Sequence, residues 1–133
     1  LVAFSGGPAN TLPQVYVRNR GAKTTTLVSA NIHGKPGNRS SFAASISANG
    51  RYVAFGTGAD EMVPGPGTDF FDLYVRDLRT KTTVMASITS TGTPIQQSTG
   101  FGAMCDTGVA FYSAYPLVMP DGNTNQQIYF RSQ

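Results

Sequence analysis

Arg-Tyr-Val-Ala-Phe at residues 51–55, followed by Leu-Tyr-Val-Arg at 73–76, is the stretch that decides the fold of this chain. Copies of both segments lie on either side of it. Val-Ala-Phe also occupies residues 2–4 and 109–111, Tyr-Val-Arg occupies 16–18, and Tyr-Phe-Arg occupies 129–131. The tyrosine of the second motif recurs after 58 and then 55 residues. A period of this length indicates a repeat protein, whose units stack to share a core.

The first two copies agree well beyond these motifs when they are aligned at an offset of 58 residues. The matching positions are Lys-Thr-Thr at 23–25 and 81–83, Ser29 and Ser87, Gly34 and Gly92, Pro36 and Pro94, and Ser40 and Ser98. The third copy keeps the register once two residues are removed. We therefore divide the chain into repeats at 1–41, 42–99 and 100–133.

Each repeat predicts short β-strands and no helix. Residues 42–47, 51–55, 73–76 and 82–87 are runs of strand length rich in β-branched and aromatic residues, apart from the small-residue run 42–47. Asn49-Gly50 predicts a tight hairpin turn, and 77–80 and 19–22 predict further turns. Val53 and Phe55 are two residues apart, so they share one face of their strand and are expected to pack between neighbouring units.

Four antiparallel strands per repeat predict an all-β fold built from β-propeller blades. Blade 42–99 is complete, whereas blade 1–41 lacks its innermost strand and blade 100–133 its outermost. Closed propellers need about four to eight blades, so we expect further blades from the same longer protein or from another copy. The open strand edges, including Val2, Phe4 and Ile128, are expected to be covered by neighbouring polypeptide.

The central repeat resembles a known family. Ser-Ile-Ser-Ala-Asn-Gly-Arg-Tyr-Val-Ala-Phe at 45–55, Met-Val-Pro-Gly at 62–65 and Asp-Leu-Tyr-Val-Arg-Asp-Leu at 72–78 are similar to the WD40-like (PD40) repeat of TolB-type β-propellers. The chain departs from that repeat at Asn49, where aspartate is usual, and at the turn 106–108. The resemblance implies a propeller fold and leaves function open, because the family includes periplasmic interaction proteins, peptidase propeller domains and secreted bacterial proteins.

Charge and composition limit the kinds of partner that this chain is expected to bind. The formal net charge is +3, only 13% of residues are charged, and Arg18, Arg76 and Arg131 share one repeat position. Equivalence through the repeat favours a structural role, bonding a neighbouring strand or blade, over a nucleic-acid patch. No run approaches the ~20 apolar residues of a membrane span. Low charge with abundant Ser, Thr, Asn and Gly favours an extracytoplasmic protein, secreted or periplasmic.

The sequence carries no recognisable catalytic motif: it lacks a nucleophile elbow, a phosphate loop and a zinc-binding His-Glu-x-x-His. Cys105 is expected to be a small buried thiol on the innermost strand of the third repeat, and no motif pairs it with His33. Asp121, Asn123 and Asn125 resemble the opening of a calcium loop, but the distal glutamate is missing. Ordinary turn chemistry explains the same residues, so calcium stays an alternative there.

The long connections predict which end of the molecule binds a partner. In a four-stranded meander, the segments 31–41, 56–71, 88–100 and 112–126 all emerge on one side, and function commonly resides on elaborated loops. The candidate binding residues on these loops are Asp60, Glu61, Asp69, Phe70, Phe71, Tyr112, Tyr115, Asp121, Asn123 and Asn125.

Three functions are compatible with these features. The first is a non-catalytic binding or scaffold propeller of an exported bacterial protein, which recognises a protein or a glycan through its long-loop face. The alternative is the propeller portion of an enzyme, either a peptidase-gating domain or a lyase or glycosidase, whose catalytic residues lie outside this chain. The third is a self-assembling structural protein whose open edges pair between chains.

Overall fold

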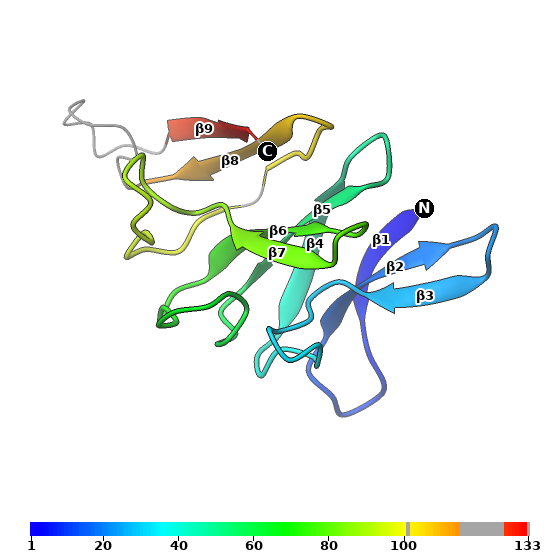
Figure 1. Ribbon diagram of the computed structural model, residues 1–133. Helices are drawn as coiled ribbons and strands as arrows, with labels where there is room; N and C mark the ends of the chain where they lie inside the picture. The colour runs from blue at the N-terminus through cyan, green and yellow to red at the C-terminus, as the bar shows by residue number, and fades with distance from the viewer. Residues whose placement is uncertain (101, 115–126, 133) are drawn as a thin grey trace.

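The computed structural model describes residues 1–100, 102–114 and 127–132, and all regular secondary structure in these ranges is β (Figure 1). The strands are β1 (Val2–Gly6), β2 (Gln14–Asn19), β3 (Thr24–Leu27), β4 (Ser41–Ile46), β5 (Tyr52–Thr57), β6 (Asp72–Asp77), β7 (Thr82–Met85), β8 (Gly108–Ser113) and β9 (Gln127–Ser132). The described ranges hold no helix of the length and apolarity that crossing a membrane requires.

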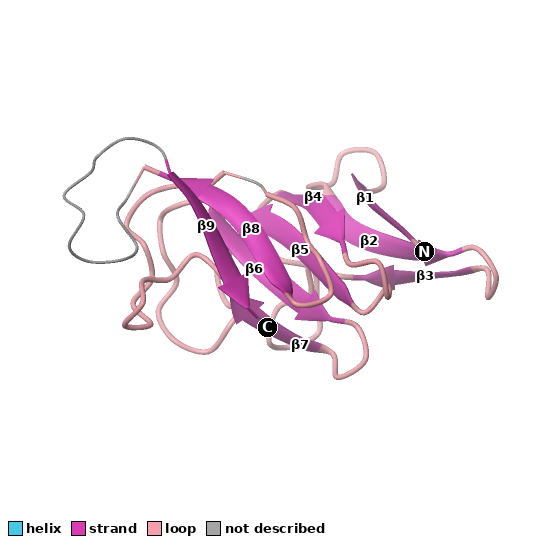
Figure 2. Cartoon of the chain, turned by 90° about the horizontal axis from the view of Figure 1, so that it is seen from above, coloured by secondary structure: helices cyan, strands magenta, loops and turns pink. Residues whose placement is uncertain are grey.

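The strands form three antiparallel sheets in chain order, as Figures 1 and 2 show. Sheet 1 contains β1-β2-β3, sheet 2 contains β4-β5-β6-β7, and sheet 3 contains β8-β9. Two isolated bridges, Gly100 to Tyr112 and Met104 to Val109, lie beside β8 in sheet 3. These sheets confirm the prediction of an all-β, antiparallel fold. Each is a meander in which sequential strands are neighbours, the pattern that short hairpin connections favour.

Positions that match between the first two repeats also adopt the same backbone conformation. Gly34 and Gly92 both have positive φ, at 74° and 85°, a region that glycine enters without steric cost. Each glycine sits in a turn closed by an isolated bridge to a proline, Ala30 to Pro36 in the first repeat and Ile88 to Pro94 in the second. The positions that aligned in sequence therefore build the same turn twice.

The side chains of each sheet divide between two faces, which we name from sheet 2. Its front face carries Phe55 opposite Tyr74 and Val53 opposite Arg76. Its back face carries the alternate residues of β5 and β6. Counterparts at the same repeat positions define the front and back faces of sheets 1 and 3.

The front face of sheet 2 packs on the back face of sheet 1. Val53, Phe55 and Tyr74 lie in one buried cluster with the sheet 1 residues Val15, Val17 and Val28. Val53 and Phe55 are both 0% exposed. The prediction that these two residues pack between neighbouring units is confirmed.

The interface between sheets 2 and 3 also joins a front face to a back face. The front-face residues Val109 and Phe111 of sheet 3 cluster with Ala54, Leu73 and Val75 on the back face of sheet 2. All five side chains are at least 97% buried. Front-on-back stacking is thus the one packing rule of the described structure, applied twice.

The repeated arginines bond neighbouring structure, as the sequence predicted. Arg18 Nη1 donates to Thr25 Oγ1 at 3.0 Å, and Arg76 Nη1 donates to Thr83 Oγ1 at 2.9 Å, in each case across to the outer strand of the same sheet. Arg131 Nη1 lies 3.4 Å from the carbonyl oxygen of Ile88, in the preceding repeat. Burial lowers the pKa of Arg76.

We predict that Phe55→Ala lowers the free energy of unfolding by about 3–5 kcal/mol, because it opens a cavity between sheets 1 and 2. Phe42→Ala is the matched control, since the Phe42 side chain is 43% exposed and its loss removes little packing. The control should change stability by about 1 kcal/mol or less. Urea denaturation of the three proteins measures both, and equal losses in the two variants would contradict the packing described.

Candidate functional site

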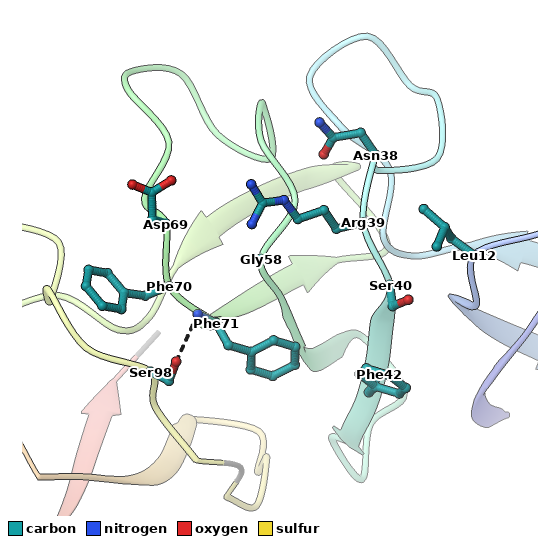
Figure 3. Close-up of a pocket in the computed structure, with 10 residues that line it drawn as sticks. All are labelled: Leu12, Asn38, Arg39, Ser40, Phe42, Gly58, Asp69, Phe70, Phe71 and Ser98. Carbon is teal, nitrogen blue, oxygen red and sulfur yellow. Dashed lines mark hydrogen bonds between the residues drawn. The ribbon is translucent and has the colours of Figure 1, made fainter.

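The loops at one end of the sheets enclose a pocket of about 570 Å³ (Figure 3). It is bordered by the β1–β2 loop, the segment that leads into β4, the β5–β6 loop and the segment that follows β7. The lining residues are Leu12, Asn38, Arg39, Ser40, Phe42, Gly58, Asp69, Phe70, Phe71 and Ser98. Connections that are distant in sequence therefore converge on one site, which fits the prediction that the long loops share a face.

Phenyl rings and a leucine form the apolar part of the pocket; Phe42 is exposed, whereas Phe70 and Phe71 are half-buried. The rings of Phe42 and Phe71 are tilted at 40° with their centroids 6.1 Å apart, and both point toward the centre of the site in Figure 3. The Leu12 side chain lines the wall and is 51% exposed. Apolar surface held open to water in this way is typical of a binding site.

Two opposite charges border this apolar surface. Arg39 extends from the segment before β4 across the pocket, toward the loop that carries Asp69 (Figure 3). Neither side chain makes a hydrogen bond or an ion pair with any residue of the described ranges. With respect to the described residues, both charges therefore remain unpaired.

Hydrogen bonds between the loops fix the shape of the pocket. Asn38 Nδ2 donates to Asp60 Oδ2 at 2.9 Å, and the Asp60 N–H donates to Asn38 Oδ1 at 3.0 Å. On the other side, the Phe71 N–H donates to Ser98 Oγ at 3.2 Å, and the Thr99 N–H donates to the Phe71 carbonyl oxygen at 3.0 Å. Such cross-links reduce the entropy that the loops would lose on binding.

A buried serine ties the start of β6 to the connection after β7. Ser87 Oγ donates to Asp72 Oδ1 at 2.8 Å and accepts from the Leu73 N–H at 3.1 Å. Thr68 in the β5–β6 loop donates its hydroxyl to the other oxygen of Asp72. This network positions the strand that immediately follows Phe71.

The first repeat builds the same network with a neutral residue. Ser29 Oγ donates to Gln14 Oε1 at 2.7 Å and accepts from the Val15 N–H at 3.0 Å. The Gln14 amide also donates to the carbonyl oxygens of Gly37 and Arg39, at 3.2 and 3.1 Å. Gln14 thereby holds the backbone of Arg39, one of the two charged residues of the pocket.

Two aspartates of β6 have pKa values shifted in opposite directions. Burial raises the pKa of Asp72 above its usual 3.8, although the hydroxyls of Thr68 and Ser87 partly offset the shift. Hydrogen bonds from Arg51 lower the pKa of Asp77, whose Oδ2 lies 2.6 Å from Arg51 Nη2. Asp77 also accepts from the N–H groups of Arg79 and Thr80, so it closes the β6–β7 turn.

The structure brings some of the predicted site residues together. Asp69, Phe70 and Phe71 line the pocket, and Asp60 supports it through Asn38. Glu61 lies outside the pocket, where its carboxylate is 3.8 Å from His33 Nε2 and its backbone carbonyl accepts from Ile32. Tyr115, Asp121, Asn123 and Asn125, with the calcium alternative, lie outside the described residues. In the described ranges, no three His, Cys, Asp or Glu side chains gather as metal ligands would.

Two predictions were wrong. Tyr112 was expected in a long loop, but it belongs to β8, where it pairs with Ile128 on the back face of sheet 3. Strand pairing continues further along the chain than the apolar run indicated. Cys105 was expected to be buried, but its thiol is exposed and contacts only Thr107 Oγ1, at 3.4 Å, among its side-chain partners in the described ranges. Its segment pairs with β8 through two isolated bridges, Gly100 to Tyr112 and Met104 to Val109, and forms no continuous strand at Cys105.

Sequence analysis missed Arg39 and Phe42, although the repeat held a signal for both. Their counterparts at the 58-residue offset are Gln97 and Gly100, so the alignment changes residue type at these two positions. No protein-family model, curated protein or solved structure matches this chain.

We predict that Asp72→Asn changes the pH dependence of stability. The folded protein holds the Asp72 proton more tightly than the unfolded chain, so this group's contribution is present below its ordinary pKa and is lost as pH rises through the raised value. An asparagine keeps the acceptor for Ser87 and removes this loss. The stability of the variant relative to the wild type should therefore increase with pH above roughly 4, measured by urea denaturation.

Asp77→Asn is the control, because its stability relative to the wild type should change with pH in the opposite direction. The lowered pKa of Asp77 contributes stability above the ordinary aspartate value, and this contribution is lost as pH falls through the lowered value. Relative to the wild type, this variant should lose most stability near neutral pH and least in acid. Slopes of the same sign in the two variants would contradict these assignments.

Proposed function

We propose that the three sheets are blades of a β-propeller, and that the chain is a non-catalytic binding module of an exported bacterial protein. The partner is a protein segment that packs an apolar side chain against the contacting rings of Phe42 and Phe71. The observation that carries this proposal is the pocket itself, where the exposed Phe42 ring contacts the half-buried Phe71 ring beside two charges that the described residues leave unused.

The arrangement of the sheets supports the propeller. Sheet 2 is a four-stranded antiparallel meander, and its neighbours stack on its two faces with the same polarity. Radial repetition of such sheets is the architecture of a propeller. The TolB-type resemblance of residues 45–78 points the same way. The basis for placing the protein outside the cytoplasm is its composition, low in charge and rich in Ser, Thr, Asn and Gly.

The pocket chemistry favours a protein segment over a glycan. Phe42, Phe71 and Leu12 offer no hydrogen-bonding groups, and the side chains of Asn38 and Ser98 already bond within the pocket walls. A sugar could bond Arg39 and Asp69 at the border, but its hydroxyl groups facing the rings and Leu12 would lose water without gaining a partner, which is costly. Burial of one aliphatic or aromatic side chain contributes roughly 1.5–3 kcal/mol. Arg39 adds a site for a neighbouring carboxylate.

We predict that peptides selected from a random library on the immobilised chain carry an apolar residue next to an acidic one. Phe42→Ala should raise their dissociation constant about tenfold or more, the loss expected for an anchor contact. Arg39→Ala should weaken binding less and reduce its dependence on salt, because it removes an exposed charge. Isothermal titration calorimetry measures all three constants.

Val84→Ala is the matched control for this experiment. Val84 is an exposed apolar residue, 50% accessible, on β7 and away from the pocket lining. Its substitution should leave the dissociation constant unchanged. A glycan array serves as the parallel test. Binding of glycans without peptides, or peptide binding that Phe42→Ala leaves intact, would overturn the proposal.

A further inference from the structure

Among the sheets formed by the described residues, two faces have no other sheet packed on them: the front face of sheet 1 and the back face of sheet 3. On the first, Val2 and Phe4 are 47% and 39% exposed. On the second, Tyr112, Ile128 and Phe130 are 43%, 83% and 60% exposed. Apolar side chains clustered on one side of a sheet are normally buried against another layer.

The exposed front face of sheet 1 is already in the conformation of a packed one. Phe4 and Tyr16 stand opposite each other, with ring centroids 5.7 Å apart and an interplanar angle of 26°. The buried pair Phe55 and Tyr74 has a centroid distance of 5.8 Å and an angle of 25°. The exposed rings therefore need little rearrangement to accept the kind of surface that covers Phe55.

The exposed back face of sheet 3 has a hollow where a ring can enter. The hollow has a volume of about 240 Å³ and is lined by Gly102, Ala103, Ala110, Phe111, Tyr112 and Ile128. Ala110 stands opposite Phe130, at the repeat positions of Ala54 and Val75 in sheet 2. Those two sheet 2 residues are the ones that the front face of sheet 3 covers.

We propose that these faces bind each other between two copies of the chain, head to tail. The front face of sheet 1 in one copy packs on the back face of sheet 3 in the next, and the Phe4 ring enters the hollow beside Ala110. This contact continues the interface that already joins sheet 1 to sheet 2 and sheet 2 to sheet 3. Because the two surfaces differ, the contact is heterologous and leads to a ring or an open chain of copies.

Two double variants test this polarity in solution. Val2→Asp with Phe4→Asp blocks the front face of sheet 1, and Ile128→Asp with Phe130→Asp blocks the back face of sheet 3. Sedimentation velocity of the wild-type chain should show association that increases with concentration and continues beyond the dimer. Each variant alone should stay monomeric, and an equimolar mixture of the two should form a 1:1 dimer, because each supplies the face that the other lacks.

Val84→Asp is the matched control, since it places the same charge at an exposed apolar position of β7, off both faces. It should associate like the wild type. Near-ultraviolet circular dichroism and a thermal melt identify any variant that has lost its packing. For such a variant, Phe4→Ser or Phe130→Ser replaces the double change.

Three results would overturn the proposal. The first is a wild-type chain that stays monomeric at every concentration. The second is association that survives in either folded variant, which would indicate that one face pairs with itself. The third is a mixture of the two variants that forms no dimer. The pocket variants used to test the proposed function leave both faces intact, so the two proposals fail independently.

Discussion

Burial of the Phe55 ring between two sheets is the interaction on which the rest of the structure depends. A β-sheet with apolar residues on both faces must be covered on both sides, and sheet 2 meets this need with sheet 1 in front and sheet 3 behind. Full burial of a phenyl side chain contributes about 1.5–3 kcal/mol. Because Phe111 occupies the same position one repeat later, a single packing rule sets the position of every described sheet.

The pocket follows from that stacking. Once the sheets are aligned by their front and back faces, the connections at one end are brought together, and they cross-link through Asn38, Asp60 and Ser98. Residues at the ends of the sheets are not all fixed by packing, and some of those that differ between repeats face solvent. Arg39 and Phe42 are such residues, and both line the pocket.

The repeat made most of the fold predictable, because residues that pack in one unit recur where they pack in the next. The strands, the turns at Asn49-Gly50 and 77–80, and the interface position of Phe55 all follow from it. Only part of the pocket was predictable, because Phe42 meets Phe71 through tertiary packing and not through any local pattern. The prediction for Cys105 was wrong for a related reason: its repeat position predicted a buried strand, whereas the segment makes only isolated bridges to β8 and leaves the thiol exposed.

The most direct test of front-on-back stacking is a methyl nuclear Overhauser experiment on the chain in solution, with labelled phenylalanine rings. The account predicts that the Phe55 ring is close to the methyl groups of Val15, Val17 and Val28, and that the Phe111 ring is close to those of Leu73 and Val75. The account would be contradicted if the Phe55 ring were close to residues of sheet 3 and not of sheet 1, or if neither ring showed contacts with the preceding repeat.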